Sequence, residues 1–239
     1  MVRGEPRSGG EPSGDMDLEK LIIAIDGPAG AGKSTVSTAL ARRLGYRLID
    51  TGAMYRALAW SVAQAGLAAE DGPALRRHLD GIDVTLDGDR VLVNERDVSG
   101  EIRTPVISAL TSRLTMLAPI RAKVTPLQRR MAAGGGVVLE GRDTGTVVCP
   151  DADVKFYLDA SDDERARRRQ AELAARGVAM ELQAVLEEIR VRDVQDKTRA
   201  LAPLRKADDA IAIDTTGLTA DQVVNRMMEE IGQRCCTRS

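Results

Sequence analysis

Short apolar runs, most of them followed by a stretch in which apolar residues have helical spacing, recur along the chain. The runs lie at residues 21–25, 47–50, 137–140, 154–158 and 210–214. A short run that is apolar nearly throughout is typical of a strand buried on both faces of a sheet. Helices are predicted at residues 33–45, 53–66, 161–177 and 219–232. Because strands alternate with helices, the pattern predicts an α/β fold in which helices cover both faces of a parallel sheet.

Two stretches interrupt this alternation. Residues 82–94 alternate apolar and polar positions around an Asp-Gly pair, which predicts an antiparallel hairpin within a longer insertion at residues 70–115. Residues 163–197 are dense in arginine and helical in pattern. Residues 1–19 are rich in Gly, Pro, Ser and charge, which is typical of a disordered tail. We therefore expect one domain over residues 20–239.

The composition allows a sizeable core but restricts what fills it. Apolar residues make up 43% of the 239 residues and aromatic residues only 2%, so aliphatic side chains must form most of the core. Trp60 and Phe156 are expected to be packing residues, because isolated aromatics do not form a stacking platform for nucleic acid. A net charge of −2 also argues against a nucleic-acid polymer as a partner.

Cysteine and histidine usage excludes several kinds of site. The three cysteines, two of them adjacent near the C-terminus, do not form a disulfide framework. His78 is the only histidine, which excludes a zinc site that requires two or more histidines, and we expect His78 on a helix surface rather than in a catalytic site. No apolar run approaches ~18 residues, and the N-terminus has no apolar signal segment. We therefore expect a cytoplasmic protein with no membrane partner.

Residues 27–34, GPAGAGKS, fit the phosphate-loop pattern G-x-x-x-x-G-K-[ST], with a predicted strand before it and a predicted helix after it. The glycines let backbone N–H groups surround phosphate oxygens, and the following helix adds its positive dipole end. Lys33 would reach the β- and γ-phosphates of a nucleoside triphosphate, and Ser34 would bind Mg²⁺, partly through water. The predicted ATP-binding residues are Gly27, Pro28, Ala29, Gly30, Ala31, Gly32, Lys33, Ser34 and Thr35.

The phosphate loop alone does not identify the second substrate. GTPases, motor ATPases and small-molecule kinases all use such a loop, but the sequence has no N-K-x-D motif for reading guanine, and a motor ATPase is usually longer. A short chain with an arginine-rich insertion favours a kinase that closes over two phosphate-bearing ligands.

Charged residues outside the loop gather in four segments. These are residues 50–56, 140–143, 164–169 and 192–199. The carboxyl ends of parallel strands lie at one edge of a sheet, so we expect the loop and the first two segments to meet there. Arg192, Asp196 and Arg199 are spaced i, i+4, i+7 and would share one helix face, and arginine suits phosphate. The alternative, both for this segment and for the arginines of residues 164–169, is an exposed helix face that carries salt bridges.

Five segments extend these motifs across the chain. They read IDGPAGAGKST, DTGAMYRALA, DVSGEIRT, GRDTGTVVCPDADVKFYLDAS and RDVQDKTRALAPL. In this order they resemble the bacterial cytidylate kinases of the nucleoside monophosphate (NMP) kinase fold, from residue 21 to residue 233. The resemblance implies a P-loop NTPase-type five-stranded parallel sheet flanked by helices, an NMP-binding insert at residues 70–115 and a lid at residues 163–197. It also implies phosphorylation of CMP and dCMP by ATP, with Mg²⁺, in pyrimidine nucleotide metabolism. We expect a monomer.

The resemblance further implies roles for individual residues. Those with a catalytic role would be Lys33, Arg142 and Arg192. The acceptor phosphate would contact Arg56, Arg142 and Arg199, the ribose hydroxyls Arg192 and Asp196, and the base Ser112, Arg121 and Asp143. The complete CMP-binding set would be Tyr55, Arg56, Ser112, Arg121, Arg142, Asp143, Arg192, Asp196 and Arg199. Ser112 and Arg121 are placed by an ungapped alignment from residues 97–104.

The implied base contacts agree with the hydrogen-bonding pattern of cytosine. Cytosine has an amino donor at N4 and acceptors at N3 and O2, so the Asp143 carboxylate can accept from N4 and an arginine can donate to N3 and O2. Uracil would place its O4 acceptor against the same carboxylate, and a mismatched buried polar group is costly. We therefore expect CMP to be preferred over UMP.

Two residues depart from the family pattern, and two other functions stay open at this point. Cys149 stands where Phe is expected, and Glu140 stands where many members have Asp. Glu140 either orients Arg142 or a Mg²⁺-bound water, or forms a salt bridge. The other functions are a P-loop kinase for a small metabolite such as shikimate and a non-catalytic nucleotide-binding module. The presence of Lys33, Arg56, Arg142 and Asp143 together speaks against the latter.

Overall fold

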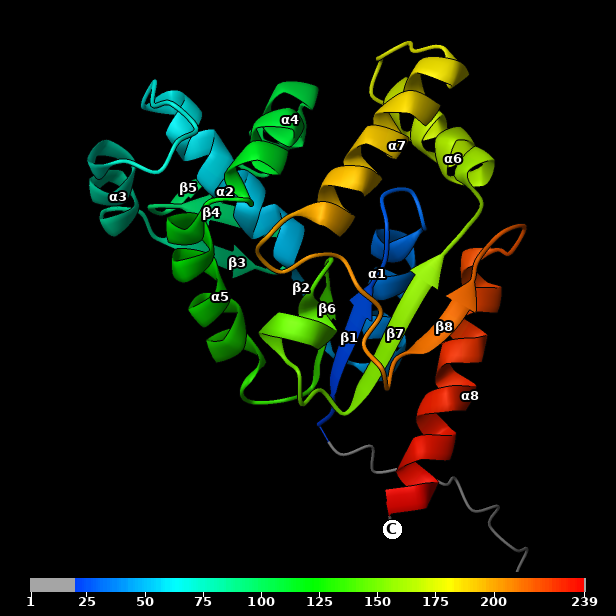
Figure 1. The fold of residues 1–239 in the computed structure, drawn as a ribbon. Coiled ribbons are helices and arrows are strands. Elements are labelled where there is room, and N and C mark those ends of the chain that lie inside the picture. The colour runs from blue at the N-terminus through cyan, green and yellow to red at the C-terminus, as the bar shows by residue number, and fades with distance from the viewer. Residues whose placement is uncertain (1–19, 239) are drawn as a thin grey trace, which may run out of the picture.

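Five parallel strands form the centre of the protein (Figure 1). The computed structural model describes residues 20–238, and the side chains as far as residue 234. The strands are β1 (Ile22–Asp26), β2 (Arg47–Asp50), β6 (Val137–Glu140), β7 (Val154–Asp159) and β8 (Ile211–Asp214), in the order β2-β6-β1-β7-β8. Each strand begins and ends within one residue of its predicted position, so the α/β prediction is confirmed. The tail predicted over residues 1–19 lies outside the described residues.

Helices cover both faces of this sheet. On one face α1 (Lys33–Leu44) packs beside α8 (Ala220–Arg238), and Val138 of β6 is fully buried in their apolar cluster. On the other face the end of α5 (Ala118–Ala132) and a π-helical turn (Thr144–Val148, called the π-turn below) pack against the alternate residues of β6. The sheet is therefore covered on both sides, as its predominantly apolar strands predict.

Several helix boundaries differ from the predicted ones: α2 (Thr51–Gln64) begins and ends two residues early, α6 (Asp162–Ala174) ends at Ala174 instead of residue 177, and α8 ends at Arg238 instead of residue 232. α2 begins early because the Asp50 carboxylate accepts a hydrogen bond from the Ala53 N–H and caps the helix. α8 continues past its predicted end at Gly232, since one glycine costs a helix only about 1 kcal/mol and the preceding Ile231 is fully buried. Neither α8 nor any other described helix is long and apolar enough to cross a membrane.

A second, antiparallel sheet stands beside the first (Figure 1). It consists of β3 (Val84–Asp87), β4 (Arg90–Val93) and β5 (Arg96–Asp97). Asp87 pairs with Arg90, which leaves Gly88 and Asp89 as the two turn residues. Gly88 has a φ of 58°, as the tight two-residue turns of hairpins require. The hairpin predicted at residues 82–94 is confirmed.

Two helices and a short turn connect the antiparallel sheet to α2 and α5. They are α3 (Pro73–Asp80), a 3₁₀ turn (Glu101–Arg103) and α4 (Pro105–Leu114), and all pack into one apolar cluster with α2 and α5. Trp60 lies in this cluster at 8% exposure, and Phe156, on β7 of the main sheet, is 1% exposed, so both are packing residues as predicted. His78 on α3 is half-buried, with its Nε2 3.2 Å from the Ser61 hydroxyl, and does not line the cavity described below.

The arginine-rich stretch forms a pair of helices, α6 (Asp162–Ala174) and α7 (Leu182–Thr198). Ser161 caps α6 through a hydrogen bond that its hydroxyl accepts from the Glu164 N–H, as the sequence predicts. The two helices share an apolar cluster of their own, made of Ala166, Leu173, Val185, Leu186 and Ile189. In Figure 1 the pair stands beyond the carboxyl ends of β1 and β7.

Burial in the sheet gives a stability prediction with a matched control. Val138→Ala removes two methyl groups from a fully buried site, so we expect the free energy of unfolding to fall by about 2–3 kcal/mol. Val106→Ala, at 75% exposure on α4, should change it by less than about 0.5 kcal/mol. Urea unfolding followed by circular dichroism measures both changes. Equal losses for the two variants would contradict the assignment of the core.

Candidate active site

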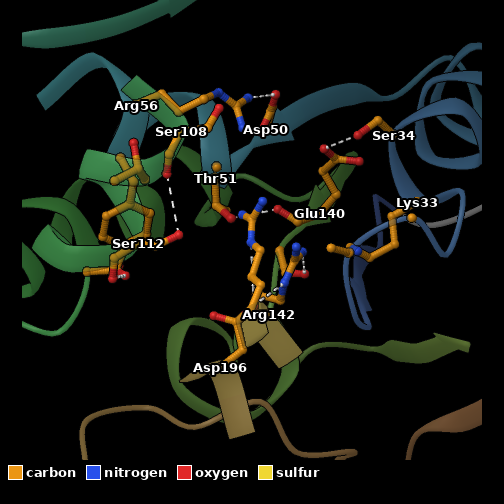
Figure 2. A pocket seen from close by; sticks show the side chains of 18 of the residues that line it. Lys33, Ser34, Asp50, Thr51, Arg56, Ser108, Ser112, Glu140, Arg142 and Asp196 are labelled. Carbon is orange, nitrogen blue, oxygen red and sulfur yellow. Dashed lines mark hydrogen bonds and ion pairs between the residues drawn. The ribbon is translucent and has the colours of Figure 1, made fainter. Parts of the chain in front are cut away.

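A cavity of about 240 Å³ opens beyond the carboxyl ends of β1, β2 and β6 (Figure 2). These three strands are adjacent in the sheet, so the loop after β1, the start of α2 and the residues that follow β6 converge there. Residues of α4, α5, α6 and α7 close the remaining sides. The predicted meeting of the charged segments at one sheet edge is confirmed.

Most of the predicted site residues line this cavity. They are Ala29, Gly30, Gly32, Lys33, Ser34, Thr35, Tyr55, Arg56, Ser112, Arg121, Arg142, Asp143, Arg192, Asp196 and Arg199. Three members of the predicted ATP-binding set do not line it. A Cβ on Gly27 would lie 2.0 Å from the Leu158 carbonyl oxygen, and Ala31 is fully buried. Pro28 offers only its carbonyl, which accepts a 2.6 Å hydrogen bond from Lys33 Nζ. These three residues shape the phosphate loop from behind.

The phosphate loop follows a backbone path that requires glycine at two cavity positions. Gly30 and Gly32 have φ angles of 77° and 82°, and a Cβ on Gly30 would lie 2.9 Å from the Cβ of Arg165. α1 begins directly after the loop, so its positive dipole end faces the cavity. Burial, followed by the charge of Arg142, holds the pKa of Lys33 well below its ordinary value. An anion bound here would stabilise the charged ammonium group.

A buried carboxylate faces the start of α1. Glu140 is 6% exposed, and its Oε1 accepts a 2.8 Å hydrogen bond from the Ser34 hydroxyl. Its Oε2 has no hydrogen-bond partner among the described residues. Burial, with the nearby Asp50 carboxylate second, raises the pKa of Glu140. Among the described residues the hydrogen-bond partner of Glu140 is thus the Ser34 hydroxyl, and Glu140 forms neither a salt bridge nor a hydrogen bond with Arg142.

Arg56 is held from two sides. Its Nη2 donates to Asp50 Oδ2 at 2.9 Å, while Asp50 Oδ1 caps α2. A Cβ on Gly52 would lie 3.1 Å from Arg56 Nη1, so any side chain at this position would crowd the guanidinium group. The helix cap and the glycine together fix a cation at the mouth of the β2–α2 turn.

Three arginines surround Asp196 of α7. The Asp196 carboxylate lies 3.0 Å from Arg142 Nε, 3.5 Å from Arg199 Nη1 and 4.0 Å from Arg192 Nε. Burial would raise the pKa of Asp196, but the three arginines, Arg142 foremost, hold it below its ordinary value. The side chains of Asp196 and Arg199 are only 13% and 4% exposed, so the alternative of an exposed salt-bridged face is wrong for these two, whereas the Arg192 side chain is 37% exposed. α7 ends at Thr198, so Arg199 follows the helix instead of sharing its face.

A second buried carboxylate lies between two arginines at the α5 side of the cavity. Asp143 accepts from Arg121 Nη1 at 2.9 Å and from Arg199 Nη2 at 3.4 Å. Arg121 also donates to the Tyr55 hydroxyl at 3.4 Å, and its Nη2 has no partner among the described residues. Ser112 of α4 lines the same end of the cavity. This end therefore offers both an acceptor and an uncommitted donor to a planar polar group.

The arginines of α6 make different contacts. Arg165 is 3% exposed, donates to the Ala29 carbonyl at 3.1 Å and pairs with Asp193 of α7. Arg168 donates to Glu164 and to the Thr215 carbonyl, whereas Arg169 lines the cavity. Only Arg169 of this group thus faces the cavity directly, and the alternative of a fully exposed face is wrong for the buried Arg165.

Further lining residues were not individually predicted. They are Asp50, Thr51, Gly52, Arg103, Ser108, Thr111, Thr115, Gly141, Glu172 and Arg176. The hydroxyl residues from Ser108 to Thr115, with Ser112 among them, have i, i+3, i+4, i+7 spacing and so share one face of α4. This helical spacing of hydroxyl residues could have predicted from the sequence that they line one surface together. The others depend on strand order and helix packing, which local patterns do not encode.

Known proteins are similar in sequence to this chain over all the elements that line the cavity. A family model described as cytidylate kinase matches residues 23–233. The curated cytidylate kinase of Geobacter sp. (strain M21) is 50% identical over 218 residues, which covers 90% of this chain and 94% of that protein. The cytidylate kinase of Carboxydothermus hydrogenoformans is 48% identical over 218 residues, covering 90% and 98%. The matched region contains every element that lines the cavity.

The buried carboxylate of Glu140 gives a pH-dependent stability prediction. Because its pKa is raised in the folded protein, the folded state retains a proton that the unfolded chain has already lost, and stability falls as pH rises through that interval. Glu140→Gln removes this loss. Without nucleotide, the unfolding free energy of the variant minus that of the wild type should become more positive from about pH 4 to about pH 7.

Urea unfolding at a series of pH values measures this difference. Glu188→Gln, the same chemical change at an exposed position of α7, serves as the control. A flat or falling difference for Glu140→Gln would contradict the raised pKa.

Proposed function

Because this chain belongs to the cytidylate kinase family, we propose that it transfers the γ-phosphoryl group of ATP to CMP and dCMP, giving ADP and CDP or dCDP. One observation supports this proposal above the others. The same cavity is lined by the phosphate loop on one side and, on the other, by the buried Asp143 carboxylate together with Arg56, Arg142 and Arg199. A site with both halves suits two phosphate-bearing substrates, one of which carries a base with an amino group.

The phosphate loop is the proposed ATP site. Its backbone N–H groups and the N-terminus of α1 surround the phosphates, and Lys33 donates to the β- and γ-phosphates. Among the described residues, no group of three or more His, Cys, Asp and Glu side chains is suited to hold a metal by itself. Ser34 and the partnerless Glu140 Oε2 fit a Mg²⁺ ion that arrives with ATP, Ser34 through its hydroxyl and Glu140 through a bound water. Such an ion would supply charge neutralisation at the β- and γ-phosphates.

The acceptor phosphate is proposed to bind Arg56, Arg142 and Arg199. Guanidinium groups bind phosphate with two parallel hydrogen bonds, and Asp50 and Asp196 already hold Arg56 and Arg142 in place. A nucleotide phosphate is ionised near neutral pH and is itself the nucleophile, so no general base is required. The residues around it therefore act by positioning and by stabilising charge as the phosphoryl group moves. We assign this catalytic role to Lys33, Arg142 and Arg192.

The cytosine base is proposed to lie between α4 and α5. Asp143 accepts from the N4 amino group, and Arg121 donates from its partnerless Nη2 to N3 or O2. Uracil would present its O4 acceptor to the Asp143 carboxylate instead. A buried mismatch of this kind is expected to make UMP a much poorer acceptor.

The helices beyond the sheet complete the proposed active site. Arg192 and Asp196 of α7 are assigned to the ribose hydroxyls, and the α6–α7 pair, residues 163–197, to a lid that excludes water from the phosphates. The hairpin unit, residues 70–115, is assigned to the NMP-binding insert, since its helix α4 lines the acceptor side of the cavity. We propose that the enzyme acts as a monomer.

An acceptor panel tests the proposed function directly. We expect ADP release from ATP to be stimulated by CMP and dCMP, and kcat/KM for UMP to be lower than for CMP by about tenfold or more. A coupled assay with CMP, dCMP, UMP, AMP and shikimate measures this. Stimulation by AMP above CMP would overturn the acceptor assignment, stimulation by shikimate alone would indicate a metabolite kinase, and ATP binding without turnover would indicate a binding module.

Two substitutions separate the phosphoryl-transfer groups from the base-reading group. Lys33→Ala should lower kcat by about a hundredfold or more with every acceptor, since a phosphate-binding cation is lost. Asp143→Ala should lower the CMP/UMP ratio of kcat/KM towards one, because the acceptor for N4 is gone. Lys206→Ala, exposed after α7, is the control and should match the wild type. An unchanged CMP/UMP ratio in Asp143→Ala would show that the base assignment is wrong.

A further inference from the structure

The π-turn after β6 is capped by a carboxylate from a different strand. Asp26 is the last residue of β1 and is 4% exposed. Its Oδ1 accepts from the N–H and the hydroxyl of Thr144, and its Oδ2 accepts from the N–H of Gly145, each at 2.8 Å. These are the first two N–H groups of the π-turn, and the second of them, that of Gly145, is at a position whose N–H the N-cap side chain normally accepts.

Asp143 occupies the N-cap position of the π-turn but does not cap it. Its side chain makes no capping hydrogen bond, although aspartate is among the residues favoured there. Its carboxylate instead contacts Arg121 and Arg199 at the cavity. Asp26 therefore accepts the N–H groups that would otherwise compete for the Asp143 carboxylate.

The strand β1 also holds the other end of the same segment. The N–H of Gly141 donates to the carbonyl of Ile25 at 3.0 Å. Two consecutive residues of β1, Ile25 and Asp26, thus anchor the chain on either side of Arg142 and Asp143. The residues assigned to the acceptor phosphate and to the base stand on a two-residue segment that is fixed at both ends.

We propose that Asp26 is a positioning residue that sets the preference for cytosine, because its capping of the π-turn leaves the Asp143 carboxylate free to accept the cytosine amino group. This inference rests on the proposed function.

The contacts of Asp26 point to the acceptor rather than to ATP. Asp26 directly precedes Gly27, so a role in shaping the phosphate loop is the natural alternative. Among the described residues, however, all of its side-chain hydrogen bonds go to the π-turn and none goes to residues 27–35. Loss of the carboxylate should therefore change base selectivity before it changes the KM for ATP.

Asp26→Asn is the first variant to test. The amide keeps one acceptor oxygen but opposes an NH₂ group to a backbone N–H, so part of the cap is lost. We expect the CMP/UMP ratio of kcat/KM to fall by roughly tenfold, from the loss of a hydrogen bond to a charged acceptor, with the KM for ATP within about twofold of the wild type. A merely structural defect would lower kcat for both acceptors equally and leave the ratio unchanged.

Thr144 provides a milder, matched pair. Thr144→Ser keeps the hydroxyl that donates to Asp26 and should keep the wild-type ratio, whereas Thr144→Val has nearly the same shape but lacks the donor and should lower the ratio by about threefold. Thr85→Val, which removes an exposed hydroxyl from the hairpin, is the control for the chemical change. If Asp26→Asn does not fold, this pair decides: equal ratios in the Ser and Val variants would overturn the proposal.

A double variant and a crystal structure complete the test. In an Asp143→Ala background, Asp26→Asn should have no further effect on the CMP/UMP ratio, because the group it positions is absent. In crystals of Asp26→Asn, the Asp143 carboxylate should lie within hydrogen-bond distance of the Thr144 or Gly145 N–H. An unchanged ratio together with a raised KM for ATP would overturn the proposal in favour of loop support. A wild type without CMP turnover would refute the proposed function, while the crystal result would still report on the cap.

Discussion

The repulsion among buried cations is the constraint on which this site depends. Lys33, Arg121 and Arg199 are only 7%, 8% and 9% exposed, and Arg142 lies close to them at the same cavity. Charges removed from water are costly unless oppositely charged groups pair with them. Carboxylates are accordingly interleaved among the cations, with Asp196 beside Arg142 and Arg199, and Asp143 beside Arg121 and Arg199. The paired carboxylates hold the guanidinium groups in place without neutralising the cavity as a whole.

The strand order explains how so many charges reach one place. β6 lies between β1 and β2. Gly141 and Thr144, which follow β6, contact the end of β1, and the last residue of β6, Glu140, accepts a 2.6 Å hydrogen bond at its carbonyl from the hydroxyl of Thr51 at the start of α2. The proposed donor and acceptor sites are therefore built on the same three strand ends. A small shift of β6 against its neighbours would change both sites together. This shared support is why a residue of β1, outside both sites, can influence the choice of base.

The fold was largely predictable from sequence, and the site only partly so. Apolar runs such as residues 137–139 indicate burial on both faces of a sheet, and an Asp-Gly pair within an alternating run indicates a hairpin, because each signal depends on neighbours in the chain. The phosphate loop could be predicted for the same reason, since its motif is contiguous in the chain. The ion pairs of Arg56 with Asp50 and of Arg142 with Asp196 were not predictable, because they depend on which strands are adjacent and where α7 crosses the cavity. Asp26 gave no signal, since an aspartate at the end of a strand does not reveal which backbone it caps.

The separate apolar cluster of α6 and α7 has a consequence for the energetics of motion. Its members pack against one another and not against the main sheet, so the pair can shift as a unit without opening the central core. What joins it to the phosphate loop and the cavity is mainly polar: Arg165 with the Ala29 carbonyl, and Asp196 with Arg142. Displacing this unit therefore exchanges ion pairs for hydrated charges and exposes little apolar surface. The free energy of such a displacement should therefore depend strongly on ionic strength, which screens ion pairs. Unfolding of the sheet differs, because it exposes apolar surface and so has a large heat-capacity change.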